Sequence, residues 1–157
     1  MSLVHLHLLL NHVPVIGLLF VLLVLGVALW RRNSETGKLG MAMLVGIAAV
    51  TAVVFLTGEP AEEAVENLAG VSEAVIHEHE EAADAALIAT SVAGVTALGL
   101  LLLYRRRELP RWAVGGTLAI VLVVSGQMAW TANLGGQIRH TEIRSASPAN
   151  DSGANEH

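Results

Sequence analysis

The stretch HVPVIGLLFVLLVLGVALWRR, residues 12–32, decides the fold of this chain. No charged residue interrupts it between its histidine and its closing pair of arginines. A helix rises about 1.5 Å per residue, so about 20 apolar residues cross a hydrocarbon core of about 30 Å. Backbone polar groups in lipid need internal hydrogen-bond partners, which a helix provides. The stretch therefore predicts a transmembrane helix over residues 14–30.

Three more stretches have the same apolar character: residues 39–57, 82–104 and 112–134. Hydrophobic residues make up 54% of the chain and aromatic residues only 4%. We therefore expect an all-α, integral membrane four-helix domain over residues 1–144 and a disordered polar tail over 145–157. The sequence has no nucleophile elbow, phosphate loop or zinc-protease motif, so we expect no catalytic activity of its own.

Charge predicts the orientation of the four helices. Of the nine Lys and Arg residues, seven lie in two short loops, residues 31–38 and 105–111. The positive-inside rule places these loops in the cytoplasm and both termini outside, as in a multi-pass protein of the bacterial inner membrane. Most of the 14 acidic residues then lie on the outer side, so the net charge of −5 gives no reason to expect nucleic acid. The expected surroundings are membrane lipid.

The outer connection between the second and third helices carries its own helical pattern. Pro60 suits the first turn of a helix, and apolar residues recur on one face at 61, 64, 65 and 68. Glu62 and its acidic neighbours are expected to point away from the bundle. The pattern predicts a short amphipathic outer helix that ends at Gly70. The next helix then begins after Ser72 and runs continuously to Tyr104.

Histidines gather at the outer rim of the predicted bundle. Measured along the helices from the inner aromatic belt, His7 stands at roughly 35 Å and His79 at roughly 38 Å, with His12 deeper at roughly 27 Å. Imidazole is costly in a bilayer and is usually kept there for a function. The six histidines that map to this rim are His5, His7, His12, His77, His79 and His140.

The expected direction of each side chain on its helix separates these histidines into two groups. Small residues at helical spacing follow His79, which leaves room for a flat ligand or for a close helix. Acidic residues follow His77, which predicts an outward face. We expect His7, His12 and His79 to face protein, and His5, His77 and His140 to be solvated or to contact lipid headgroups. The stripe below His79 consists of Ala82, Ala83, Ala86 and Ala93.

The leading hypothesis for these residues is a b-type haem near the outer face. Haem b takes axial nitrogens from different helices, and His79 with His7 or His12 would supply them. Arg139 and Arg144 could pair with the haem propionates. The chain has no cysteine, which excludes c-type attachment and thiolate sites. Such a protein would be an electron-transfer subunit between membrane quinone and an outer-side cytochrome.

Two other hypotheses stay open. A copper or zinc ion could be held by His7, His12 and His79, although the acidic 77–81 segment lacks the i, i+4 spacing of helical zinc sites. Alternatively, the chain is a cofactor-free accessory subunit of a larger respiratory or redox membrane complex. In that case the imidazoles would bond to a backbone carbonyl freed by Pro14, or to side chains such as Gln127.

The first and last motifs of the chain look familiar. His7 and His12 with the following Pro14 resemble the His-Pro…His-x-Pro opening of a bacterial family of predicted four-helix membrane proteins of unknown function. Residues 134–138, Leu-Gly-Gly-Gln-Ile, resemble the closing Gly-Gly-x-Leu motif of that family. Leu8 stands where the family has its first proline. The resemblance implies a four-helix membrane architecture and draws attention to the two histidines.

Overall fold

The computed structural model describes residues 2–64 and 71–139, and every regular element in these ranges is an α-helix. Four helical segments are long and apolar enough to cross a membrane, with α1 and α2 together forming the first. The predicted all-α bundle with four membrane-spanning helices is confirmed, and the chain is a multi-pass membrane protein. The helices are α1 (Leu3–Leu10), α2 (His12–Arg31), α3 (Ser34–Leu56), α4 (Gly58–Glu63), α5 (Glu73–Leu103) and α6 (Arg111–Arg139).

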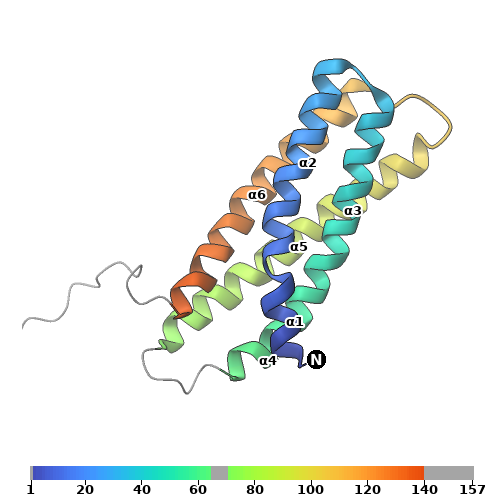
Figure 1. The fold of residues 1–157 in the computed structure, drawn as a ribbon. Coiled ribbons are helices and arrows are strands. Elements are labelled where there is room, and N and C mark those ends of the chain that lie inside the picture. Colours follow the sequence, from blue (N-terminus) through green and yellow to red (C-terminus); the bar gives the residue numbers. More distant parts are fainter. Residues whose placement is uncertain (1, 65–70, 140–157) are drawn as a thin grey trace, which may run out of the picture.

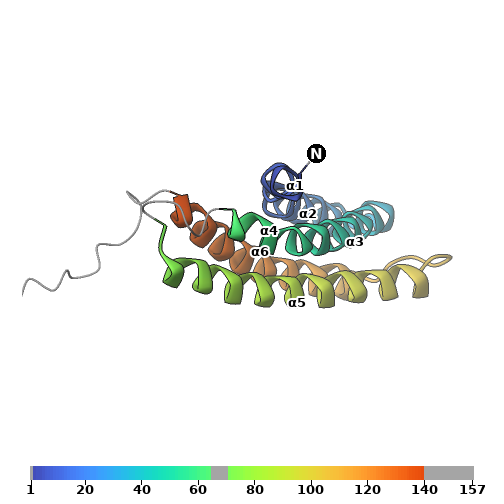
Figure 2. The same ribbon diagram turned by 90° about the horizontal axis from the view of Figure 1, so that it is seen from below.

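The four long helices form a bundle in which each helix packs against two of the others. Helix α2 contacts α3 and α6, and α5 contacts the same two helices from the other side. Figures 1 and 2 show that α1, α4, the start of α5 and the end of α6 lie together at one end of the bundle. We call this the histidine end. The opposite end carries residues 31–38 and 105–111, and we call it the arginine end.

The apolar core is continuous from the arginine end to beyond the middle of the bundle. Its helices approach closely where side chains are small: a Cβ on Gly94 of α5 would lie 2.5 Å from the Cβ of Ala48 in α3. Ala86 and Ala93 are buried in the same core. The alanine stripe below His79 therefore holds a close helix, and of the two predicted alternatives the room for a flat ligand is not found there.

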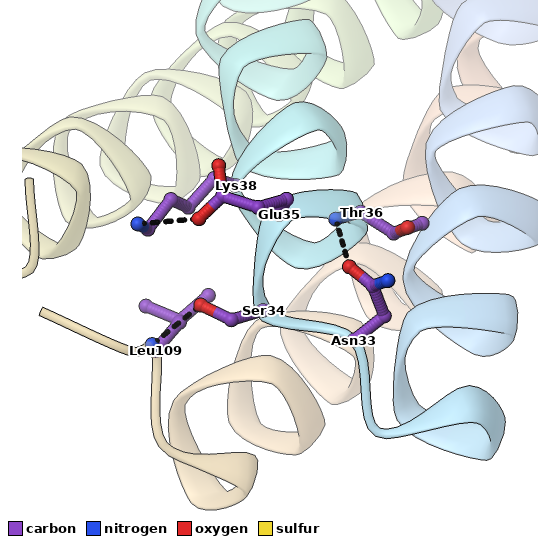
Figure 3. A network of polar contacts seen from close by, with 6 residues as sticks. All are labelled: Asn33, Ser34, Glu35, Thr36, Lys38 and Leu109. Atoms are coloured by element: carbon purple, nitrogen blue, oxygen red, sulfur yellow. Dashed lines mark hydrogen bonds and ion pairs between the residues drawn. The ribbon is translucent and has the colours of Figure 1, made fainter.

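The loop between α2 and α3 is fixed by the ends of both helices. Arg32 is the one non-glycine residue with positive φ in the described ranges, at 54°. The left-handed turn lets the amide of Asn33 donate to the carbonyl of Ala28, at 3.0 Å. The Oδ1 of Asn33 then accepts the amide of Thr36 at 2.9 Å and caps α3 (Figure 3).

A hydrogen bond joins the two loops of the arginine end. The buried amide of Leu109 donates to the Oγ of Ser34 at 2.7 Å (Figure 3). Lys38 and Glu35 form an exposed ion pair beside it, at 2.8 Å. The Leu109 amide precedes α6 and has no helical acceptor of its own, so Ser34 fixes the start of α6 against α3.

At the histidine end the first and third spanning helices begin earlier in the sequence than their apolar stretches do. The first span begins at Leu3, with only Asn11 between α1 and α2. The predicted continuous helix from residue 73 is confirmed as α5. Helix α4 begins the predicted outer helix, and the rest of that prediction, residues 65–70, lies outside the described residues, as does the predicted tail.

Candidate functional site

His7 links α1 to the end of α3. Its Nδ1–H donates to the carbonyl of Val54 at 3.0 Å, with the Oγ1 of Thr57 at 3.3 Å as a second acceptor. Helix α3 ends at Leu56, so the Val54 carbonyl belongs to the last turn, where carbonyls lack an i+4 partner. Because Nδ1 carries the proton, the Nε2 of neutral His7 keeps its lone pair.

His79 makes the equivalent bond between α5 and α6. Its Nδ1–H donates to the carbonyl of Thr131 at 3.1 Å. A side chain four residues after a helical carbonyl lies close beside it, and that position is Gly135. A Cβ on Gly135 would lie 3.0 Å from Cε1 and 3.4 Å from Nδ1 of the ring. The glycine thus makes space for the imidazole, whose Nε2 is again left unprotonated.

Polar contacts one turn below fix the position of His79. The Oγ1 of Thr131 donates to the carbonyl of Ala82 at 2.9 Å, and the Nε2 of Gln127 donates to the same oxygen at 3.2 Å. These two bonds hold the register of α5 against α6. The ring of His79 therefore sits on a rigid helix pair, as a ligand-holding side chain needs.

The two half-buried imidazoles, His7 of α1 and His79 of α5, have similar surroundings. Each has Nδ1 bound to a main-chain carbonyl, and each lies beside a glycine, since a Cβ on Gly58 would be 3.8 Å from Cε1 of His7. Buried apolar residues of α5 and α6 continue to this end, at Ile76, Ala82, Leu134 and Ile138. The buried polar residues here are Thr51, Thr57 and Thr131.

His12 does not join them. Its side chain is exposed on α2, so the prediction that it faces protein is wrong. Five residues on a helix turn through about 500°, which places His12 about 140° away from His7 along a nearly continuous helix. With His7 held against α3, that rotation brings His12 to the outside of the bundle.

The secondary histidines that the structure describes lie on its surface. His5 and His77 are exposed, and the His77 ring lies 3.6 Å from Glu80 and 3.4 Å from Glu81. The predicted outward face of His77 is confirmed. His140 and Arg144 lie outside the described residues. Arg139 ends α6, and its side chain is likewise outside the description.

A small metal ion finds few ligands at the histidine end. Over residues 2–64 and 71–139, no group of three or more His, Asp or Glu side chains is arranged to hold one. The trio of His7, His12 and His79 does not converge, because His12 faces outward. The described residues hold two half-buried imidazoles at this end, His7 bonded to α3 and His79 bonded to α6.

Among the described residues outside the spanning helices, Glu62 of α4 is the acidic side chain with a perturbed proton affinity. Partial burial raises the pKa of Glu62 to about 7, helped by a hydrogen bond to Glu80 and by the charges of Glu80 and Glu59. A hydrogen bond between two carboxyl groups requires a proton on one of them. Glu62 lies beside Glu80, which is an exposed residue of α5.

Sequence reasoning missed the partners of the two imidazoles. Thr57, Thr131 and Gly135 were not assigned to the site, and Gln127 binds Ala82 and not a histidine. The spacing of Gln127 and Thr131, four residues apart on one face of α6, was the available signal.

Comparison of the chain with protein-family models, curated proteins and solved structures finds no match.

Proposed function

We propose that this protein is a membrane-anchored electron-transfer subunit that binds b-type haem at its histidine end, with His7 and His79 as axial ligands. The proposal depends on one observation. Two imidazoles from different helices at the same end of the bundle both donate Nδ1–H to main-chain carbonyls. This second hydrogen bond is typical of metal-ligating histidines, because it fixes the ring and makes Nε2 a better ligand.

Small residues lie beside both imidazoles. A Cβ on Gly135 would lie 3.0 Å from the ring of His79, and a Cβ on Gly58 would lie 3.8 Å from the ring of His7. Further down, the close approach of α3 and α5 at Gly94 leaves no slot between them. Haem bound at the upper level would supply one-electron redox chemistry. The protein's part is to hold two neutral imidazoles in fixed orientation and to keep lipid and water from displacing them.

Haem explains the pair better than copper or zinc does. Bis-histidine ligation needs two protein nitrogens, whereas a small ion in an imidazole site takes three or four protein ligands. The nearby carboxylates of Glu80 and Glu81 lie beside the outward-facing His77. Haem b requires two protein ligands, and His7 and His79 would supply them.

The two ends of the bundle suggest how the subunit works. The positive-inside rule favours a cytoplasmic arginine end in a bacterial inner membrane, which leaves the histidine end at the periplasmic face. There the site would exchange electrons with membrane quinone and with an outer-side cytochrome. Arg139, the last residue of α6, and Arg144, five positions later in the sequence, are proposed as partners of the haem propionates.

A cofactor-free accessory subunit is the second candidate. The observation in its favour is that the same histidine bonds tie α1 to α3 and α5 to α6, which is a structural task in itself. Under this alternative, substituting His7 or His79 would change only stability.

A difference spectrum separates the two candidates. The full-length protein is expressed with haem supply, purified in detergent, and its reduced-minus-oxidised absorption spectrum is recorded. We expect a b-type signal that is lost in His7→Ala and in His79→Ala. The matched controls are His5→Ala on α1 and His77→Ala on α5, both exposed, which should keep it. Absence of a chromophore, or a signal that survives both site substitutions, would contradict the proposal.

A further inference from the structure

Charged side chains are distributed unevenly between the two ends of the bundle. The loops of the arginine end carry seven of the nine Lys and Arg residues but only two of the 14 acidic residues, Glu35 and Glu108. Glu35 is already paired with Lys38. Arg31 and Arg32, at the end of α2, are both exposed. The arginine end therefore presents an excess of positive charge where a spanning helix reaches the lipid headgroups.

The end of α2 combines this charge with an aromatic ring. Trp30 is 80% exposed, and the guanidinium of Arg31 lies 6.0 Å from the centre of its ring, in cation–π range. Helix α6, which packs against α2, begins at the same end with exposed Arg111 and Trp112. Tryptophan favours the interface between hydrocarbon and headgroups. Each pair thus places a guanidinium beside an interfacial ring, at the depth of lipid phosphates.

A shallow apolar groove leads along α2 away from this charged end. Its lining consists of Leu19, Leu22, Leu23, Gly26, Val27 and Trp30. Gly26 leaves the middle of the groove open, since a Cβ there would meet nothing within 4 Å. From Trp30 to Leu19 the helix rises about 16 Å, close to the depth of one leaflet in a hydrocarbon core of about 30 Å. The groove therefore covers the depth of one lipid acyl chain and ends beside the guanidinium of Arg31.

Arg32 has a backbone conformation that glycine adopts at lower cost. Its φ of 54° is left-handed, and no other non-glycine residue in the described ranges has a positive φ. The left-handed residue at a helix end is most often glycine. The arginine is thus present at a cost in stability, and strained positions of this kind cluster where a side chain has a function. Its guanidinium adds a second positive charge next to Arg31.

We propose that the end of α2 is a binding site for an anionic phospholipid, with the phosphate on Arg31 and Arg32 and one acyl chain in the groove. Guanidinium groups bind phosphate oxygens through paired hydrogen bonds. A zwitterionic lipid fills the same groove, but the positive charge of its headgroup offsets the attraction. Charge complementarity therefore selects the anionic lipid. Each arginine near a membrane surface is worth about a factor of five in the binding constant.

Tryptophan fluorescence tests the site at Trp30. The full-length protein keeps Trp30 as its single tryptophan, through Trp112→Phe and Trp130→Phe, and is placed in vesicles of phosphatidylcholine and phosphatidylglycerol. Bromine on an acyl chain quenches a neighbouring indole, so two series with bromine on one lipid or the other give the relative affinity. We expect phosphatidylglycerol to be preferred at least about fivefold. Arg31→Gln combined with Arg32→Gln should bring the preference close to one.

The matched control is Arg105→Gln combined with Arg106→Gln, which removes the same charge from the other loop. These residues follow α5, on the other side of the bundle from α2, so the preference at Trp30 should largely remain. An equal loss in both double variants would indicate the diffuse field of the whole end and would overturn the proposal. Equal quenching by the two lipids, as ordinary boundary lipid gives, would also overturn it. So would the absence of quenching, which would mean that protein covers the groove.

Arg32→Gly separates lipid binding from stability. Glycine suits the left-handed position, so the melting temperature should stay equal or rise. The preference for phosphatidylglycerol should nevertheless fall at least about twofold. An unchanged preference would contradict the role of Arg32. Quenching is measured relative to vesicles without bromine, which cancels any quenching by haem, so the outcome is independent of the electron-transfer proposal.

Discussion

Gly135→Ala tests the histidine site through the space that the glycine leaves. The new Cβ would lie 3.0 Å from Cε1 of His79, whereas carbon atoms in good contact are about 3.5–4.0 Å apart. The ring must therefore withdraw by about 0.5–1 Å. The Nδ1 atom now lies 3.1 Å from the Thr131 carbonyl, and such a shift takes it beyond hydrogen-bond range.

The expected magnitudes differ between stability and haem binding. Losing the hydrogen bond costs about 1 kcal/mol of stability, and replacing a helical glycine by alanine returns about the same amount. The free energy of unfolding should therefore change little. Haem affinity should fall about 10–100-fold, as it does when a ligating histidine loses its orienting partner. Gly126→Ala is the control on the same helix, because its Cβ would meet nothing within 4 Å.

The assay is a haem titration of the apoprotein followed by absorbance, with thermal unfolding of the same samples. The expected result is weakened haem binding by Gly135→Ala, with nearly unchanged unfolding, and unaffected binding by Gly126→Ala. Equal haem affinity in Gly135→Ala and wild type would refute the reasoning. So would an equal loss in both variants, because the effect would then not come from the His79 ring.

Three further predictions concern the packing, the arginine end and the pH response. Gly94→Ala forces α3 and α5 apart and should cost about 1–3 kcal/mol in reversible unfolding, whereas Gly99→Ala should cost nothing. Ser34→Ala leaves the buried Leu109 amide without its acceptor and should lower the free energy of unfolding by about 1–3 kcal/mol. Ser34→Thr keeps a hydroxyl and should restore stability. Equal stability of the wild type and both variants would count against the bond. Folding raises the pKa of Glu62 from 4.5 to about 7, so the folded state binds the proton more tightly and stability from this group falls as pH rises between those values. Glu62→Gln should flatten that pH dependence of the melting temperature, and an unchanged slope would contradict the shared proton.

The four spans and the facing of α5 could be predicted from the sequence because both follow from local patterns. A long apolar run in lipid forms a helix because its backbone polar groups need internal hydrogen-bond partners. The acidic residues after His77 determine which face of α5 turns outward. His79 accordingly lies half-buried, and His77 is exposed. These properties depend on residues that are neighbours on one helix, so no knowledge of tertiary contacts was needed.

The partners of the imidazoles could not be predicted in this way. Val54 and Thr131 contribute main-chain carbonyls, which every residue possesses, so side-chain patterns do not distinguish them. His12 was misplaced because bulky apolar residues on its face, such as Ile16 and Leu19, are compatible with protein packing and with lipid contact alike, and both are exposed. The alanine stripe was compatible with a ligand or a helix, and the burial of Ala82, Ala86 and Ala93 together with the bonds from α6 to the Ala82 carbonyl decides for a helix.

The most direct measurement is the electron paramagnetic resonance spectrum of the oxidised full-length protein after haem supply. Two imidazoles as axial ligands predict a low-spin ferric signal in the wild type and in His77→Ala. His7→Ala and His79→Ala should each convert the remaining haem to high spin or lose it. A wild type without low-spin haem, or an unchanged low-spin signal in both ligand variants, would contradict the assignment of the histidine end.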